Sequence, residues 1–98
     1  MTLMTTWSES DYYDIIGSSG CRLIVMGERG EQWTEETLRL FQDDEVRVDF
    51  LPWSQVADLR VQLELVFYPA VQLWRAGALK AEVSGYHCDS LKKLIQSM

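Results

Sequence analysis

The segment CRLIVM, Cys21 to Met26, constrains the fold of this chain more than any other stretch. It lies between Gly20 and Gly27, is too short for a helix, and is apolar enough to be a strand that is buried on both faces. A strand covered on both faces needs helices above and below its sheet. The sequence therefore predicts an α/β fold.

Four segments have the caps and the spacing of helices. The first, in SESDYYDIIGSSG, ends at Gly17, and the second begins with Thr34 as its N-cap and stops near Asp43. The third is the short SQVADLRVQL, for which Ser54 is the cap. The last, CDSLKKLIQSM, begins at Asp89 and carries one apolar face. These are the helices that the buried strand requires.

Three more strands follow from alternation and turn residues. Val46 to Leu51 alternates, and Pro52 removes a backbone donor where that strand should end. The segment VFYPAVQLWRAGALKAEVSG contains two apolar-rich runs joined at Ala76-Gly77, which predicts an antiparallel hairpin of Ala70–Arg75 and Leu79–Val83. The predicted sheet thus has four strands, with the end of the hairpin at its edge and two parallel strands at its centre, Arg22–Met26 and Val46–Leu51.

The order of these elements resembles the thioredoxin fold over the whole chain, 1–98, as one domain. LIVMGERGEQWTEETLRLF has the layout of that family's strand, active-site loop and helix. YPAVQLWRAGALKAEVSG resembles the family's cis-proline strand and hairpin, with Pro69, Gly77 and Gly85 at three characteristic positions. The resemblance implies a thioredoxin-like, central mixed four-stranded sheet flanked by helices, with a cis bond between Tyr68 and Pro69 before the third strand.

The loop GERGEQW lacks the two active-site cysteines of the family it resembles. The resemblance places Gly30 and Trp33 at the positions of the two cysteines, and neither side chain can form a mixed disulfide. The strand LIVM also lacks the buried acid that assists resolution in the family. Cys21 and Cys88 are far apart in the sequence. The resemblance therefore implies a redox-inactive member, and we expect no dithiol–disulfide oxidoreductase activity and no enzyme of that kind.

Composition argues against several other functions. A formal net charge of -6 and a pI near 4.6 argue against nucleic acid and anionic membranes as partners. No segment approaches the ~20 apolar residues of a membrane span, and the N-terminus does not resemble a signal peptide, so we expect a cytoplasmic protein. One His and two distant Cys leave no ligand set for zinc, and no cofactor is expected.

The former active-site face is the candidate binding site. In the family, the loop and the proline segment lie side by side, and the backbone beside the proline pairs with an extended polypeptide. Trp33 is either a plug in the core or an exposed anchor for a partner. The expected partner is a polypeptide client, a partner protein or a second copy of this chain. The site residues are Glu31, Gln32, Trp33, Phe67, Tyr68 and Pro69.

A closer resemblance links VFYPA and SGYHCDSL to segments of the thioredoxin-like chaperones of hydrogenase maturation. It implies a chaperone-like role for the binding face.

Two alternatives remain open on the residues themselves. The acidic cluster around the loop is either a solvated face or a site that selects a basic segment; it contains Glu28, Glu31, Glu35 and Glu36, opposed by Arg29. Cys88 follows His87 just before a helix, surroundings that lower the pKa of a thiol. The alternative function is therefore a single-cysteine thiol enzyme or thiol sensor that uses Cys88 or, with less support, Cys21.

Overall fold

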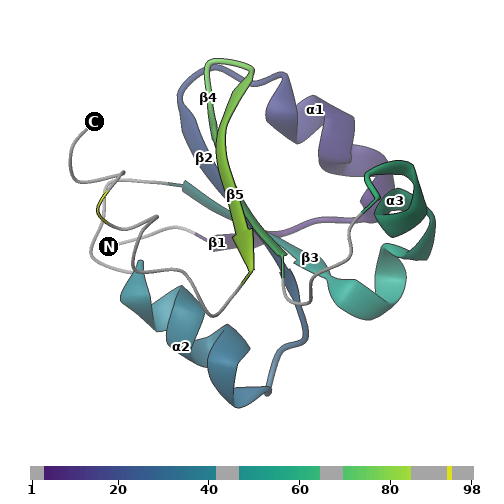
Figure 1. The fold of residues 1–98 in the computed structure, drawn as a ribbon, viewed down its shortest axis with the longest axis vertical. Helices are drawn as coiled ribbons and strands as arrows, with labels where there is room; N and C mark the ends of the chain where they lie inside the picture. The colour runs from purple at the N-terminus through teal and green to yellow at the C-terminus, as the bar shows by residue number, and fades with distance from the viewer. Residues whose placement is uncertain (1–3, 42–46, 65–69, 85–92, 94–98) are drawn as a thin grey trace.

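The computed structural model describes residues 4–41, 47–64, 70–84 and 93 (Figure 1). Within them, five strands form one sheet: β1 Met4–Thr6, β2 Cys21–Gly27, β3 Arg47–Pro52, β4 Ala70–Arg75 and β5 Ala78–Ser84. Their order is β1-β3-β2-β4-β5. β1 and β2 are parallel to β3, whereas β4 is antiparallel to both β2 and β5. The mixed sheet with β2 and β3 inside it and β5 at an edge is confirmed.

Three α-helices and two 3-10 helices connect the described strands: η1 Glu9–Asp11, α1 Tyr12–Ile16, α2 Gln32–Leu40, η2 Trp53–Gln55 and α3 Ala57–Gln62. α2 lies on one side of the sheet, and α1 and α3 lie on the other (Figure 1). We name these sides the α2 face and the α1/α3 face. Lys93 is the described residue of the predicted C-terminal helix, and it is helical; the rest of that helix and the predicted cis bond at Pro69 fall outside the described residues.

β1 makes the predicted count of four strands wrong. It is three residues long and too short to show an alternating pattern, so its pairing depends on a neighbour distant in the sequence. That neighbour is β3, with Met4 opposite Val48 in a parallel ladder. The backbone N–H of Trp7 extends the contact by donating to the carbonyl of Phe50 at 2.8 Å.

The starts of two predicted helices were wrong. α2 begins three residues early, because Glu31 has the extended backbone of an N-cap, with φ -75° and ψ 137°, while Thr34 lies in the first turn with its side chain buried. The third helix is divided into η2 and α3 at Val56, where φ of -119° and ψ of 33° leave helical geometry. Ser54 therefore lies within η2 and does not cap α3. Gly17 ends α1 as predicted.

The central strands are buried on both sides, as the apolar run predicts. Arg22, inside that run, is nevertheless a buried charge. The buried core residues on the α2 face are Leu23, Val25, Phe41, Val48, Phe50, Val71 and Leu73. Those on the α1/α3 face are Tyr12, Ile15, Ile24, Met26, Leu51, Val56, Leu59 and Ala70.

The predicted hairpin is confirmed, with its turn at Ala76-Gly77. Both residues have left-handed backbones, with φ of 51° and 81°, which matches the twist of the flanking strands. The N–H of Ala76 donates to the carbonyl of Gly20 at 3.0 Å. This bond fixes the hairpin turn to the loop that precedes β2.

Candidate functional site

The candidate site lies at the end of the sheet formed by the carboxyl ends of the two central parallel strands, β2 and β3. Gly27 and Pro52, the last residues of these parallel strands, are paired in register. The connection to α2 leaves the sheet from Gly27, and η2 follows Pro52 directly, so the N-terminus of α2 and η2 meet the same edge (Figure 1). Ligands of open α/β sheets bind beyond the carboxyl ends of the strands. We call this region the α2 edge.

The loop between β2 and α2 is fixed to the first turn of α2. The N–H of Glu31 donates to the carbonyl of Glu28 at 3.3 Å, and Gly30 permits this turn with a φ of 93°. Arg29 donates from Nε and Nη2 to the two carboxylate oxygens of Glu35 at 2.8 and 3.1 Å. Gly30 N–H adds a bond to Glu35 at 3.2 Å. The bonds from Arg29 and then from Gly30 lower the pKa of Glu35.

The same loop is also tied to η2. The backbone N–H of Ser54 donates to Oε1 of Glu28 at 2.6 Å, across 26 positions of sequence. Trp53, the preceding residue, is half-buried and packs against the core of the α1/α3 face. The guanidinium carbon of Arg60, on α3, lies 4.6 Å from the centroid of the Trp53 ring. The α2 edge is therefore a continuous structure from α2 through the loop to η2 and α3.

The structure brings two of the six predicted site residues together. Glu31 is the N-cap of α2 and Gln32 its first residue, and both are exposed. The backbone of Trp33 follows in the same turn, but its side chain is outside the described part of the chain, as are Phe67, Tyr68 and Pro69. The contact of the loop with these residues stays a prediction.

The acidic side chains around the loop make bonds within the chain. Glu28 accepts from Ser54, Glu35 from Arg29, and Glu36 accepts from the side-chain amide of Gln32 at 3.0 Å. Three of the four glutamates in the predicted acidic cluster therefore have partners among the loop and its neighbours.

Thr34 is a residue of this edge that the sequence analysis misplaced. It lies one helical turn after Glu31, its side chain is completely buried, and its Oγ1 has no hydrogen-bond partner in the described part of the chain. The inward-facing position of the first turn of α2 is therefore held by a hydroxyl.

The sequence matches no protein-family model and no curated protein. The structure is similar to the short form of thioredoxin f from spinach chloroplast, with a TM-score of 0.76 and 16% identity over 97% of this chain and 92% of that one. Thioredoxin from Trypanosoma brucei brucei gives 0.77 and 10% identity over 99% and 89%. Oxidized mitochondrial thioredoxin 3 from Saccharomyces cerevisiae gives 0.72 and 16% identity over 97% and 95%.

The chain has a thioredoxin-like fold. Identities this low establish the fold alone, so the chemistry of this thioredoxin-like chain has to be argued from its own residues.

Cys21 is far from the α2 edge of the thioredoxin-like fold. It begins β2, whereas the loop to α2 leaves from Gly27, and seven strand residues span roughly 20 Å. Burial raises the pKa of the Cys21 thiol, and the charge of Arg75 opposes this only in part. A raised pKa reduces the thiolate fraction at neutral pH. His87 and Cys88 lie outside the described residues.

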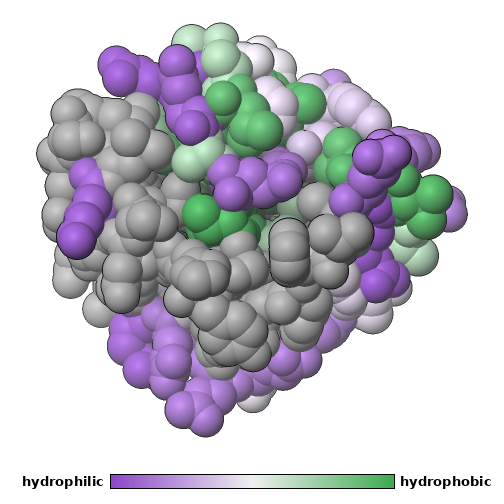
Figure 2. Space-filling model, in the orientation of Figure 1, coloured by the Kyte–Doolittle hydropathy of each residue, from purple (hydrophilic) through white to green (hydrophobic). Residues whose placement is uncertain are grey.

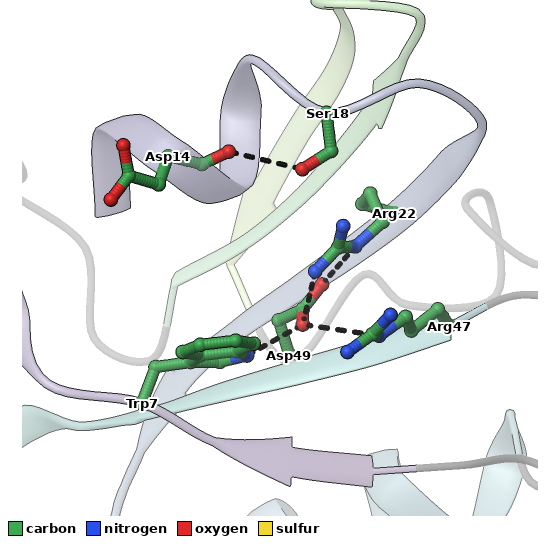
Figure 3. A network of polar contacts seen from close by, with 6 residues as sticks. All are labelled: Trp7, Asp14, Ser18, Arg22, Arg47 and Asp49. Atoms are coloured by element: carbon green, nitrogen blue, oxygen red, sulfur yellow. Dashed lines mark hydrogen bonds and ion pairs between the residues drawn. The ribbon is translucent and has the colours of Figure 1, made fainter. Parts of the chain in front are cut away.

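A buried carboxylate is present, but on the opposite face from α2. Asp49 is completely buried on β3 and accepts from Nε and Nη2 of Arg22 at 2.7 and 2.8 Å. The indole N–H of Trp7 donates to the same carboxylate at 2.7 Å, and Arg47 approaches it at 3.8 Å (Figure 3). The bonds to Asp49 raise the pKa of Arg22. This carboxylate is occupied by its partners and stabilises the α1/α3 face.

Within the described ranges, no group of three or more His, Cys, Asp or Glu side chains is placed to hold a metal ion. No helix there is long and apolar enough to cross a membrane. The coloured residues at the end that holds α2 are mostly hydrophilic, whereas the side of α1, α3 and the hairpin shows hydrophobic residues among hydrophilic ones (Figure 2).

Proposed function

We propose that this thioredoxin-like chain is a redox-inactive interaction module that binds a polypeptide at the α2 edge. The observation that carries the proposal is the first turn of α2, which runs from Glu31 to Thr34 without a thiol. Dithiol exchange needs a thiolate at the helix N-terminus and a resolving thiol one turn along. The resemblance puts Gly30 and Trp33 at those two positions, and the adjacent N-cap Glu31 and first-turn Thr34 carry no thiol either.

The structure of the edge supports binding without catalysis. The loop is held on one side by the bonds of Glu35 and on the other by the bond of Glu28 to η2. A surface fixed before binding loses little conformational entropy when a partner docks. An extended polypeptide that pairs with backbone groups needs no catalytic side chain.

The bound polypeptide is a client or partner protein, or a second copy of this chain. The resemblance of VFYPA and SGYHCDSL to hydrogenase-maturation chaperones favours a client protein that is held during its maturation. The full proposed site comprises Glu31, Gln32, Trp33, Phe67, Tyr68 and Pro69. Single-thiol chemistry is the alternative, and the raised pKa of Cys21 weighs against its use of that residue.

Reduction of insulin disulfides tests the redox part of the proposal. Turnover by this chain is expected to stay at the background rate, beside a thioredoxin as positive control, because the first turn of α2 offers no thiol. Turnover that disappears in a Cys88→Ser variant, but not in Cys21→Ser, would establish the single-thiol alternative.

A pull-down from the native host, followed by affinity measurement, tests the binding part. Trp33→Ala is expected to weaken the complex by about 2 kcal/mol or more if Trp33 anchors the partner, with an unchanged melting temperature. If Trp33 instead fills the core, the melting temperature falls and the affinity remains. Leu79→Ala is the control, because Leu79 is an exposed apolar residue beside the hairpin turn, at the end of the sheet opposite the α2 edge. An unchanged affinity in Trp33→Ala would sink the proposed site.

A further inference from the structure

Arg60 is a charged residue near the α2 edge whose guanidinium has no carboxylate partner among the residues that the structure describes. Glu28 receives the N–H of Ser54, and Arg29 is paired with Glu35. The guanidinium of Arg60, by contrast, makes no hydrogen bond or ion pair with the described residues, and its Nε is a buried atom without a partner. A buried donor that lacks an acceptor is costly, and such groups in native proteins call for an explanation.

The helix that carries Arg60 offers it no acid. Glu64 is four positions on, but it lies beyond the end of α3 with a left-handed φ of 53°. Asp58 is two positions back and so does not face Arg60 on the helix. The chain has a formal net charge of -6, yet this arginine remains unpaired within its described part.

The Trp53 ring determines where the guanidinium is held. Arg60 lies over it at 4.6 Å, and both residues are half-buried. Stacking on an indole restricts a guanidinium and removes part of its water, which strengthens the hydrogen bonds that its remaining donors can form. Trp53 is next to Ser54, whose N–H binds the loop that leads into α2. The stacked pair therefore adjoins the proposed polypeptide site.

We propose that Arg60 and Trp53 form a subsite for the carboxylate of an Asp or Glu side chain in the bound polypeptide. The inference rests on the proposed function and names the chemistry of the partner. A guanidinium recognises a carboxylate through charge-assisted hydrogen bonds, and the indole accepts the apolar stem of the acidic residue. Glu35 is the loop glutamate paired with a cation, whereas Glu28 and Glu36 accept from neutral donors and keep their charge. Arg60 is the cation beside the loop that no described carboxylate neutralises, so an acidic residue of the polypeptide would be selected at its guanidinium and not at the loop.

The test uses a displayed library of random peptides of about 12 residues, selected on the intact protein. Selected peptides are expected to share an acidic residue at one position. A synthetic peptide with Glu at that position is expected to bind roughly tenfold more tightly than its Gln counterpart, the size of one charge-assisted hydrogen bond. Arg60→Gln should remove this preference. Arg39→Gln, an equal change of charge in the last turn of α2, should keep it.

Spectroscopy of the unmodified protein provides a measurement that does not depend on a variant's folding. In ¹⁵N-labelled protein, the Arg60 Nε–H signal is expected to shift on addition of the Glu peptide and to remain in place with the Gln peptide. Trp53→Leu keeps apolar packing and removes the ring, so it should reduce the preference for Glu.

The outcomes separate the subsite from the proposed function. Peptides that shift the backbone signal of Gln32 but show no acidic preference overturn the subsite and leave polypeptide binding at the α2 edge intact. An acidic preference of equal size in the wild type and in Arg60→Gln overturns the subsite as well. A selection that yields no binding peptide overturns both proposals.

Discussion

Toward α2, the buried side chains of the strands are all apolar, whereas toward α1 and α3 the same strands also bury Arg22, Asp49 and Gln72. Gln72 accepts from the hydroxyl of Tyr12 at 2.8 Å and from the indole N–H of Trp74 at 2.9 Å. Its amide donates to Glu82 on β5 at 2.5 Å. One sheet thus has an apolar face and a face with hydrogen-bonded polar groups.

We expect the two faces of the sheet to differ in how well they tolerate substitutions more than in how much each contributes to stability. Apolar contacts are non-directional, so a side chain of similar volume can replace another at small cost. Buried polar groups need partners at defined distances and angles, and a partner's removal leaves a desolvated group behind. We therefore expect the α1/α3 face to define the register of β2, β3 and β4 more strictly than the α2 face does.

The largest expected effect is that of Asp49→Ala. The change removes the partner of a buried guanidinium, so unfolding free energy should fall by about 3–5 kcal/mol in a urea titration. The double variant Arg22→Met, Asp49→Leu replaces the pair with apolar groups and should recover most of that loss. A double variant as unstable as Asp49→Ala would show that the salt bridge is needed for more than the neutralisation of Arg22.

Leu23→Ala probes the apolar face at the neighbouring position of β2. Leu23 is fully buried, so the cavity should cost about 3 kcal/mol in the same urea titration. Leu23→Met conserves volume and should cost less than about 1.5 kcal/mol. If Leu23→Met proved as costly as Leu23→Ala, the α2 face would be as demanding as the polar face and the contrast between the faces would fail.

Tyr12 allows the polar face to be tested by pH. Burial raises its pKa to about 12 from 10.0, although the bond to Gln72 opposes the rise. Below pH 10 the phenol is protonated in both states, and above it the unfolded chain loses the proton first. Stability should therefore be full below pH 10 and fall above it, by up to about 1.4 kcal/mol per pH unit.

The variant Tyr12→Phe should lose this part of the pH dependence and about 1 kcal/mol at neutral pH, the value of one hydrogen bond. Urea titrations from pH 8 to pH 11 measure both quantities. Tyr13→Phe is the control, because the exposed Tyr13 bonds to Gln62 and this change keeps the burial of Tyr12 and its bond to Gln72. An equal slope in Tyr12→Phe and the wild type would contradict the assignment to Tyr12.

The contrast also explains what could be predicted from the sequence. The alternation of β3 and the Ala76-Gly77 turn are local patterns, and each predicts its element correctly. β1 has no such pattern, because three residues become a strand only by pairing with β3. Asp49 occupies a polar position of an alternating strand, a pattern that predicts a solvent-facing side chain. Its burial depends on Arg22 and Trp7, which come from other parts of the chain.

The candidate site also contains features that nearby residues predict and features that depend on packing between distant segments. Glu31 and Gln32 could be assigned because a helix start is encoded by nearby residues. The contact of Glu28 with Ser54 and the stacking of Arg60 on Trp53 depend on how β3 and α3 pack beside the loop. No spacing in the sequence encodes those contacts, so the proposed carboxylate subsite was visible only in three dimensions.

The smallest expected effect concerns a second arginine–carboxylate pair, Arg29 with Glu35. Its two bonds match the geometry of the Arg22–Asp49 pair, but its side chains are 51% and 33% exposed, against 10% and 0% for the buried pair. Water and salt screen an exposed pair, so Arg29→Gln should leave the urea midpoint unchanged within error. Two ion pairs with the same geometry would then differ in their effect on unfolding free energy because one is buried and the other is exposed.

The pKa of Glu35 should nevertheless report the loss of Arg29. The carboxyl titrates below its ordinary value of 4.5, chiefly through the bonds from Arg29. The ionised Glu35 carboxylate contributes to stability above the pKa that it has in the unfolded chain, and this contribution is lost as the pH falls through its pKa in the folded protein. In Arg29→Gln, an NMR titration of the Glu35 carboxyl carbon should show a higher pKa, with part of the lowering kept by the N–H of Gly30. Arg75→Gln, at the far end of the sheet, should leave that titration unchanged. An unchanged pKa of Glu35 in Arg29→Gln would mean that the backbone turn alone holds the loop. The contact between Arg29 and Glu35 would then result from the shape of the loop and would not help to maintain that shape.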